Sequence, residues 1–344
     1  MIVVMRADST AQDLAGVVAL LDRQGLSAHV SQGEAHTIVG VVGSPIDHGE
    51  LSPALEALSG VDRTVKVSKS YKLASRQFQP ADTVIDVRGV KIGGPEVVVI
   101  AGPCSAESEE QCLRIGDAVA SAGARLFRAG AYKPRTSPYA FRGHGEAGLE
   151  MLARVRETIG LPIVTEVLTP AHVALVASYA DVFQIGARNM QNYLLLEEVG
   201  RTEVPVLLKR GPSATIEEWL LAAEYVMAQG NRKVILCERG IRTYETATRN
   251  TFDVNAVAYA KRETHLPVIA DPSHGTGVRS LVSPVGLSAI AAGADGLIVE
   301  VHHDPDKSWS DAAQALGLET FGELMAKGEA VARAVGRDWA GVPV

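Results

Sequence analysis

The chain has 344 residues, of which 47% are hydrophobic and 21% are charged. This composition is ordinary for a globular protein with a large core and excludes disordered and fibrous proteins. The net charge of -7 argues against general binding to nucleic acid or anionic membranes, which requires a broad basic surface. An anion-binding site must therefore be local.

The N-terminal apolar run is too short for a signal peptide, and no later run approaches the ~18 apolar residues of a membrane span. We therefore expect a cytoplasmic protein. Its cysteines are few and odd in number: Cys104, Cys112 and Cys237. They therefore do not indicate a disulfide framework.

Residues 1–70 predict a small α+β domain. The pattern runs strand (2–5), helix (10–25), strands (27–31 and 36–43), helix (50–60) and strand (63–69). Leu14, Val17, Val18 and Leu21 form one apolar helical face. This order is typical of a ferredoxin-like fold. Residues 71–81 lack periodicity and contain a proline, so we expect a linker there.

Residues 82–344 predict a second domain built from repeated strand–helix units. Eight short apolar runs begin 20 to 37 residues apart, at Val97, Arg125, Pro162, Val182, Pro205, Val234, Pro267 and Gly296. The helix that follows the fifth run has a capping-box pattern at Thr215 and Glu218. Eight continuous apolar strands favour a closed (β/α)8 barrel, with an open doubly wound sheet as the alternative.

Two further features complete the predicted barrel. Residues 83–94 read as two short strands about Arg88 and Gly89, and we expect this hairpin to plug the bottom of the barrel. No GxGxxG pattern follows a strand, so the sequence contains no dinucleotide fingerprint.

Cationic residues cluster where the predicted strands end. Barrel enzymes place their active sites at these ends. The cations are Arg128, Lys133, Arg135, Arg188, Lys209, Arg210 and Arg239. Each alone is compatible with a solvated strand end. Together, in an acidic protein, they indicate an anionic substrate with phosphate and carboxylate groups.

A second group of residues predicts a metal site. Cys104, His274 and Glu300 lie at the ends of the first, seventh and eighth strands, which are neighbours in a closed barrel. Asp311, in the loop after the eighth strand, adds a fourth donor, and His302 and His303 are competing ligands. Thiolate, imidazole and carboxylate together suit Mn, Fe, Co or Zn. Cys112 and Cys237 have no such neighbours, so we interpret them as packing residues.

Seven segments carry a resemblance to a known family. They are IAGPCSAES, FRAGAYKPRTSPYAFRG, QIGARNMQN, LLKRG, LCERGIRTYE, ADPSHGTG and VEVHHDPDKSWSDAAQAL. In this order they closely resemble the short, type I beta form of 3-deoxy-arabino-heptulosonate 7-phosphate synthase. The resemblance covers residues 80–340, and the ferredoxin-like domain resembles that of the regulated members.

The resemblance implies roles for particular residues. Cys104, His274, Glu300 and Asp311 correspond to the four ligands of one divalent transition metal. The cations that hold phosphoenolpyruvate correspond to Arg128, Lys133, Arg188, Lys209 and Arg239. Arg135 and Thr136 correspond to the site for the aldose phosphate. The KPRT segment favours erythrose 4-phosphate over the five-carbon substrate of the related 3-deoxy-manno-octulosonate 8-phosphate synthase.

The implied enzyme is a transferase of the shikimate pathway, which leads to chorismate and the aromatic amino acids. It joins phosphoenolpyruvate to erythrose 4-phosphate and releases phosphate. Lys133 is the expected proton donor if cationic neighbours lower its pKa. A Schiff-base aldolase using Lys133 or Lys209 is an alternative enzyme, and a noncatalytic metabolite sensor is an alternative of another class.

The resemblance also implies feedback inhibition. The expected inhibitor is tyrosine or phenylalanine, bound between ferredoxin-like domains of a homotetramer or other homo-oligomer. His29 and Ser31 alternate along one predicted strand, so they share a face and are the candidate regulatory residues. The other interpretation is that this domain only shields the barrel or supports assembly.

Overall fold

The computed structural model describes residues 1–33, 37–43, 48–65, 70–134, 137 and 139–341. It divides into two compact units. The first comprises Met1–Asp82 with Glu263–His265, and the second comprises Thr83–Arg262 with Leu266–Val344. Among the described helices, none is long and apolar enough to cross a membrane.

The first unit contains a four-stranded antiparallel sheet with the order β2-β3-β1-β4. The strands are β1 (Ile2–Met5), β2 (Ser27–Gln32), β3 (Thr37–Val42) and β4 (Val61–Val65), and the helices are α1 (Ala11–Arg23) and α2 (His48–Glu56). Thr10 and Asp13 form a capping box that begins α1. Val17 and Leu21 of α1 pack against Val3 and Val39 of the sheet. The predicted ferredoxin-like domain is confirmed.

Residues 71–81 belong to the first unit. Tyr71, Leu73 and Phe78 are buried. The Phe78 ring lies against Gly40 of β3, where an added Cβ would come within 2.6 Å of the ring. This segment is therefore packed against its own unit. The functional boundary between the domains stays a prediction.

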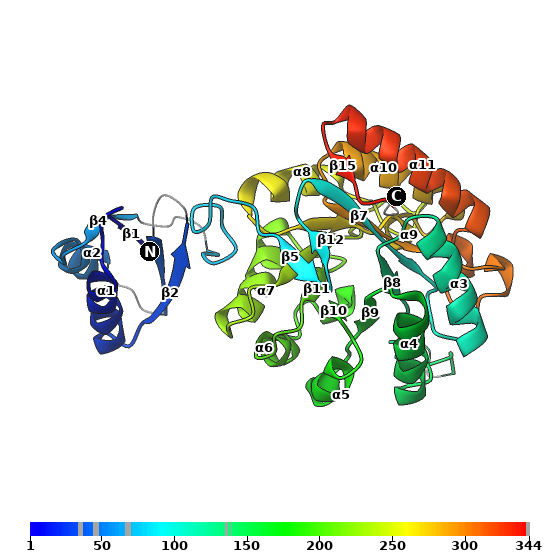
Figure 1. Ribbon diagram of the computed structural model, residues 1–344, viewed down its shortest axis with the longest axis horizontal. Coiled ribbons are helices and arrows are strands. Elements are labelled where there is room, and N and C mark those ends of the chain that lie inside the picture. The colour runs from blue at the N-terminus through cyan, green and yellow to red at the C-terminus, as the bar shows by residue number, and fades with distance from the viewer. Residues whose placement is uncertain (34–36, 44–47, 66–69, 135–136, 138, 342–344) are drawn as a thin grey trace. The chain divides into compact units, whose positions relative to one another are not determined.

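The second unit is a closed barrel of eight parallel strands (Figure 1). The strands are β7 (Glu96–Gly102), β8 (Leu126–Arg128), β9 (Ile163–Glu166), β10 (Val182–Ile185), β11 (Val206–Lys209), β12 (Val234–Glu238), β13 (Val268–Ala270) and β14 (Gly296–Glu300). Pairing of β14 with β7, from Gly296 opposite Val98 to Glu300 opposite Gly102, closes the barrel. The predicted (β/α)8 barrel is confirmed, and the open sheet is excluded.

Helices surround this barrel. They are α3 (Glu109–Ser121), α4 (Glu146–Ile159), α5 (Val173–Ala177), α6 (Tyr193–Gly200), α7 (Ile216–Ala228), α8 (Val254–Glu263), α10 (Arg279–Ala291) and α11 (Leu318–Ala334). The predicted capping box of Thr215 and Glu218 begins α7. Trp219 on its apolar face is buried and donates to the Leu208 carbonyl of β11 at 3.1 Å. Amphipathic periodicity thus docks each long helix onto the sheet.

The hairpin consists of β5 (Ile85–Val87) and β6 (Val90–Ile92). Both turn residues, Arg88 and Gly89, have positive φ angles, as a tight two-residue hairpin requires. Ile85 and Ile92 join one buried cluster with inward-facing strand residues such as Val98 and Ile269. The hairpin therefore fills the barrel interior at the end where the strands begin. A short strand, β15 (Asp338–Trp339), pairs with the start of β7.

One predicted run ends differently in the structure. The sequence suggested an extended segment through residues 267–275, but β13 ends at Ala270 and a short helix, α9 (Pro272–Thr276), follows. The Asp271 side chain accepts the backbone N–H of His274, and Pro272 occupies the first helical position. Aspartate before proline is a strong helix start, and it overrides the apolar pattern here.

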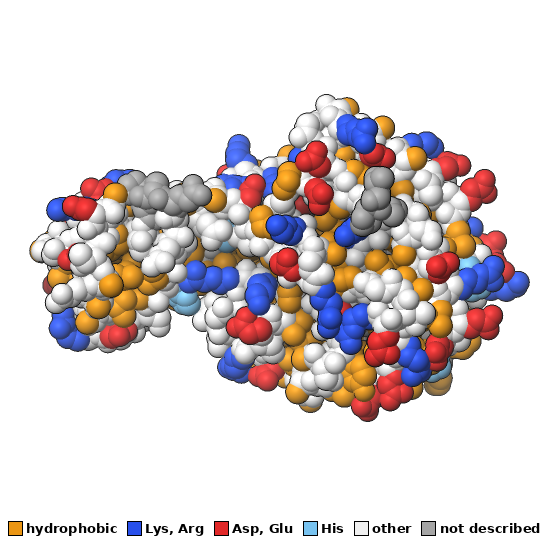
Figure 2. Space-filling view, viewed as in Figure 1, with side chains coloured by type: hydrophobic (Ala, Val, Ile, Leu, Met, Phe, Trp, Pro, Cys, Tyr) orange, Lys and Arg blue, Asp and Glu red, His pale blue; other side chains and the backbone are white. Residues whose placement is uncertain are grey.

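Basic and acidic side chains are interspersed on the face of the molecule shown in Figure 2. This distribution agrees with the expectation, drawn from the net charge, that an anion-binding site is local.

Candidate active site

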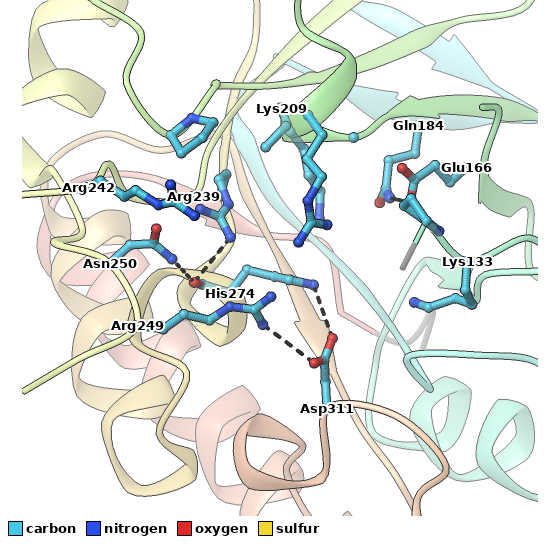
Figure 3. A pocket seen from close by; sticks show the side chains of 15 residues that line it. Lys133, Glu166, Gln184, Lys209, Arg239, Arg242, Arg249, Asn250, His274 and Asp311 are labelled. Atoms are coloured by element: carbon cyan, nitrogen blue, oxygen red, sulfur yellow. Dashed lines mark hydrogen bonds and ion pairs between the residues drawn. The ribbon is translucent and has the colours of Figure 1, made fainter. Parts of the chain in front are cut away.

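A cavity of about 340 Å³ opens at the ends of the barrel strands. Its walls come from β9, β10 and β11 and from the segments that follow β8, β10, β11, β12, β13 and β14. Among the residues that the structure describes, six cations line it: Lys133, Arg188, Lys209, Arg239, Arg242 and Arg249. Figure 3 shows Arg239, Arg242 and Arg249 together on one side and Lys133 on the other. An acidic protein has thus gathered positive charge around one cavity, as a multiply anionic ligand requires.

Four of these cations were predicted, and Arg242 and Arg249 were missed. Both lie in the long loop between β12 and α8, beyond the strand end at Glu238. Arg242 lies in LCERGIRTYE, one of the segments that resemble the family, and Arg249 had no signal in the sequence. Glu166, Gln184 and Asn250 also line the cavity and were missed. A residue-type pattern does not mark them, because acidic and amide side chains are common at solvated strand ends.

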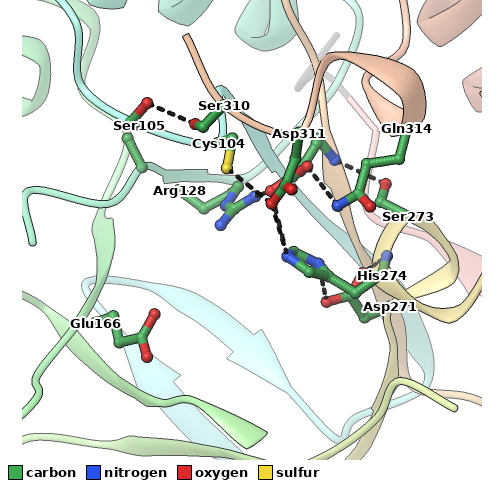
Figure 4. Close-up of polar contacts among 12 residues, drawn as sticks. Cys104, Ser105, Arg128, Glu166, Asp271, Ser273, His274, Ser310, Asp311 and Gln314 are labelled. Atoms are coloured by element: carbon green, nitrogen blue, oxygen red, sulfur yellow. Dashed lines mark hydrogen bonds and ion pairs between the residues drawn. The ribbon is translucent and has the colours of Figure 1, made fainter. Parts of the chain in front are cut away.

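The predicted metal ligands lie close together, and Figure 4 shows three of them, Cys104, His274 and Asp311. His274 and Asp311 also line the cavity. Donor atoms of Cys104, Glu300 and Asp311 all lie within 4.8 Å of one another. His274 Nε2 is 3.4 Å from Glu300 Oε1 and 4.0 Å from Asp311 Oδ2. One thiol, one imidazole and two carboxylates therefore surround a common point. This donor set and spacing fit a divalent transition metal.

Neighbouring side chains orient these four residues. His274 Nδ1 is 2.8 Å from Asp271 Oδ2, which leaves Nε2 directed at the cluster. A carboxylate behind a histidine is the usual support of a metal-binding imidazole. Glu300 accepts hydrogen bonds from Arg128 Nη1 and from Gln314 Nε2, both at 2.7 Å.

Asp311 lies in a loop held to the barrel end. The hydroxyls of Ser105 and Ser310 hydrogen bond at 2.8 Å. Glu107 accepts the backbone N–H of Trp309 at 2.8 Å. These contacts fix the two residues that directly precede the aspartate.

The charges of the cluster set its protonation. Burial raises the pKa of the Cys104 thiol to about 12, and Glu300 and Asp311 add to the shift. A metal cation would reverse this by stabilising the thiolate. Burial would also raise the pKa of Glu300, but the charges of His274, Arg128 and Lys133 hold it far below its usual range. Burial lowers the pKa of His274, which favours the neutral imidazole that binds metals.

Lys133 differs from expectation in one respect. Burial would lower its pKa, but interactions with Cys104 and Glu300 raise it above the usual value. Lys133 Nζ lies 3.0 Å from Cys104 Sγ and 2.9 Å from the Cys104 carbonyl oxygen. The expected lowering by cationic neighbours is therefore wrong, because negative groups are closer. Lys133 is an ammonium ion at neutral pH and retains a proton to donate.

Arg128 and Arg210 have internal partners, as Lys209 has in Asp271. Arg128 is buried, pairs with Glu300 and is absent from the described residues that line the cavity. Arg210 pairs with Glu238 at 2.9 Å and with Asp253 at 3.1 Å. Its guanidinium therefore joins β11 to the loop before α8, away from the predicted cationic ring. Arg135 and Thr136 lie outside the described residues.

The competing histidines lie elsewhere. His302 Nε2 is 3.5 Å from Glu107 Oε2, and its Nδ1 accepts the backbone N–H of Asp304. The His303 ring stacks on His302. Among the described residues, the metal cluster contains neither. Cys112 and Cys237 are buried, as expected of packing residues.

The candidate regulatory residues lie on the edge strand β2. His29 pairs with Gly40 and Ser31 pairs with Ile38. Both are partly buried, and they share the sheet face opposite to Ala28 and Val30, which contact the helical core. Their regulatory role stays a prediction.

Comparisons with known proteins agree with this architecture. Residues 67–335 match the model of the DAHP synthetase I family, and residues 1–69 match the DAHP synthase ferredoxin-like domain. Phospho-2-dehydro-3-deoxyheptonate aldolase of Thermotoga maritima is 48% identical over 98% of this chain and 99% of its own length. A 2-dehydro-3-deoxyphosphooctonate aldolase of Syntrophobacter fumaroxidans is 33% identical over 70% of this chain and 89% of its own length.

Solved structures show the same relationship. The crystal structure of the Thermotoga maritima enzyme matches with a TM-score of 0.78 over 98% of both chains. A truncated form of 3-deoxy-D-arabino-heptulosonate 7-phosphate synthase from the same organism matches with a TM-score of 0.74 over 78% of this chain and 99% of its own. The chain therefore belongs to the DAHP synthetase I family and is an enzyme, a transferase of the 3-deoxy-7-phosphoheptulonate synthase type.

Proposed function

We propose that this enzyme joins phosphoenolpyruvate to erythrose 4-phosphate in a metal-dependent, aldol-type condensation. C3 of phosphoenolpyruvate bonds to the aldehyde carbon, water adds at C2, and the C2–O bond to phosphate breaks. The products are 3-deoxy-arabino-heptulosonate 7-phosphate and inorganic phosphate. The observation that carries the proposal is one cavity where, in the described part of the chain, six cations lie near a cluster of four candidate metal ligands.

Cys104, His274, Glu300 and Asp311 would hold the metal. A divalent Mn, Fe, Co or Zn ion held there would act as a Lewis acid toward the aldehyde oxygen. This assistance matters because an enol phosphate is a weak nucleophile. The fit of the donor set supports this assignment, and the choice among the four metals stays open.

Three cations are suited to hold phosphoenolpyruvate. Arg188, Lys209 and Arg239 come from consecutive strand ends and line the same wall of the cavity. Arginine binds phosphate and carboxylate through two parallel hydrogen bonds, and lysine adds a point charge. Holding both substrates in one cavity lowers the entropic barrier of a two-substrate reaction. Arg128 and Lys133 complete the proposed set, with Arg128 acting from beneath through its pair with Glu300.

Lys133 is the proposed proton donor to the oxygen of the former aldehyde. Its raised pKa keeps the ammonium form at neutral pH, and its Nζ lies 3.0 Å from the Cys104 sulfur. The proton source thus lies beside the place where negative charge develops. A Schiff-base mechanism is disfavoured because it needs an uncharged amine. Lys133 is held as an ammonium ion, and Lys209 is buried in a 2.6 Å ion pair with Asp271.

The second candidate is 3-deoxy-manno-octulosonate 8-phosphate synthase. The relatives with the corresponding name cover less of the chain and are less similar than the Thermotoga maritima enzyme. Lys133, Pro134, Arg135 and Thr136 favour the four-carbon acceptor. Arg135 and Thr136 are the proposed site of the aldose phosphate, and this assignment rests on the family resemblance.

Acceptor choice gives a direct test. Phosphate release from phosphoenolpyruvate should be faster with erythrose 4-phosphate than with arabinose 5-phosphate. Arg135→Lys should raise KM for the aldose phosphate more than KM for phosphoenolpyruvate, because lysine lacks the planar two-point grip. Equal effects on both values would contradict the role of Arg135, and preference for the five-carbon sugar would support the second candidate.

The remaining expectations are also part of this proposal. They are a cytoplasmic location, a place in the shikimate pathway, a homotetrameric or other homo-oligomeric state, and inhibition by tyrosine or phenylalanine through the ferredoxin-like domain.

A further inference from the structure

We propose that Arg249 and Gln314 form a positioning pair that holds the two carboxylate ligands, Glu300 and Asp311, in their metal-binding orientation. The inference rests on the metal site of the proposed function. It assigns a task to one arginine that the cation pattern of the sequence did not single out and to one buried glutamine.

A continuous chain of contacts joins these residues. Arg249 Nη1 donates to Gln314 Oε1 at 2.9 Å and lies 3.5 Å from Asp311 Oδ1. Gln314 Nε2 then donates to Glu300 Oε2 at 2.7 Å. One guanidinium therefore acts on Asp311 directly and on Glu300 through the glutamine amide. Its contact with the Gln314 oxygen also fixes which amide atom faces Glu300.

The pair connects separate loops that carry the ligands. The backbone N–H of Arg249 donates to the Thr276 carbonyl at 2.8 Å, at the end of the short helix that carries His274. Its side chain reaches the loop after β14, where Asp311 precedes the turn η4 (Ala312–Gln314) and Gln314 is its last residue. Figure 3 shows Arg249 extending across the cavity toward Asp311. Arg249 thereby sets the position of one ligand loop relative to the other.

Asp311 needs such support. Its φ angle is +51°, in the left-handed region that non-glycine residues seldom adopt. This conformation is unfavourable for a residue with a side chain and persists where surrounding contacts hold it. The backbone N–H of Gln314 donates to the Asp311 carbonyl at 3.1 Å, so both residues belong to one hydrogen-bonded turn. A contact that orients Gln314 therefore also stabilises the turn that presents Asp311.

Charge gives a second reason for an arginine. Cys104, Glu300 and Asp311 bring a thiol and two carboxylates within 4.8 Å of one another. Like charges at this distance repel, and a cation beside them stabilises the ionised forms that bind a metal. Arg128 supplies one cation from beneath, at 2.7 Å from Glu300 Oε1. Lys133 supplies a second beside Cys104, and Arg249 supplies a third beside Asp311.

Arg242 provides a matched control. It is an arginine from the same loop and lines the same cavity. Among the residues that the structure describes, none forms an ion pair with it, and it makes no contact with the metal ligands. Removing its charge alters the cavity without changing the support of Glu300 or Asp311.

The test measures Co²⁺ binding to metal-free protein through the near-ultraviolet absorbance of a thiolate–Co²⁺ bond, which needs no turnover. Arg249→Gln and Gln314→Met should each weaken Co²⁺ binding about 10- to 100-fold, as loss of supporting contacts does at other metal sites. The double variant should lose less than the product of the two effects, because both residues act through one chain. Arg249→Lys should recover part of the affinity through its charge. Arg242→Gln should bind Co²⁺ like the unchanged enzyme.

Gln314 is buried, so its variant needs a folding check by circular dichroism, and the part-exposed Arg249 decides the result. If Arg249→Gln binds Co²⁺ as the unchanged enzyme does, or if Arg242→Gln loses as much affinity, the positioning pair is wrong while the metal site stands. If the unchanged enzyme shows no Cys104-dependent Co²⁺ absorbance, the metal site of the proposed function fails together with this inference.

Discussion

Asp271 lies between Lys209, a cation that lines the cavity, and His274, a proposed metal ligand. Its Oδ2 lies 2.6 Å from Lys209 Nζ and 2.8 Å from His274 Nδ1. Burial would raise the pKa of Asp271, but the charges of His274 and Lys209 hold it well below its usual value. A buried carboxylate of this kind is stable only with such partners. Lys209, a proposed substrate-binding residue, and His274, a proposed metal ligand, thus share one orienting group.

Cys104→Ala tests the proposed metal site by removing one ligand atom, the cysteine sulfur. The thiol is the soft ligand of the proposed set, so its loss should remove tight binding of a transition metal together with activity. The barrel should still fold, because the change removes only one sulfur atom from a strand end. Metal content and phosphate release would be measured on the same sample.

Cys112→Ala is the control for this change. Cys112 is also buried, but it lies on α3 and is absent from the metal cluster of described residues. It should keep metal and activity. A Cys104→Ala enzyme that retained both would contradict the ligand role.

Some site residues could be predicted from the sequence, and others could not. Glu300 could be, because a charge within an apolar strand is costly without a partner. Arg249 and Gln314 could not, because they are 65 residues apart in segments without periodicity, and only the fold brings them together. Arg128 shows a further limit. Its position at a strand end was foreseeable, but its pairing with Glu300 depends on barrel closure between β14 and β7.

At the scale of elements, the barrel strands were the most predictable part of the chain. Strands covered on both faces form nearly continuous apolar runs, and all eight were recognised. Their ends were less predictable, as α9 demonstrates, because the helix signal at Asp271 and Pro272 competes with the preceding apolar run. The position of α9 matters for the candidate site because this helix carries His274, a proposed metal ligand.

The hairpin of β5 and β6 gives a prediction at this scale. Ile92→Ala should destabilise the folded enzyme by about 2–5 kcal/mol, because it leaves a cavity in a closely packed core. Ile92 is fully buried among the inward-facing strand residues. Thermal and urea unfolding would measure the change.

The matched control is Lys91→Ala, one position away on the same strand and exposed to solvent. It should have a small effect, as surface changes usually do. If both variants unfolded alike, the hairpin would not be part of the barrel core.

In the molecule as a whole, the two units pack separately, so we expect catalysis and regulation to be separable. The cavity and all described metal ligands come from the second unit. The first unit has its own hydrophobic core. The sequence predicted both folds from periodicity, but periodicity says nothing about a ligand for the first unit. That assignment depends on the family resemblance alone.

Deletion of residues 1–70 should leave substantial activity and abolish inhibition by tyrosine or phenylalanine. A solved truncated form of the Thermotoga maritima relative supports the choice of this variant. An inhibitor changes activity only by binding one conformation more tightly than another, and the deletion removes its proposed site. Both amino acids would be titrated against the full chain and the truncated chain. No inhibition of the full chain, or equal inhibition of both, would contradict the regulatory role.

The most direct test of the account is the metal dependence of phosphate release from phosphoenolpyruvate in the presence of erythrose 4-phosphate. The full-length enzyme would be treated with a chelator, shown to be metal-free by elemental analysis and then supplied with Mn²⁺, Co²⁺, Fe²⁺ or Zn²⁺. We predict that the metal-free enzyme releases no phosphate and that at least one of these ions restores release together with the seven-carbon product. Full phosphate release by the metal-free enzyme would contradict the central claim.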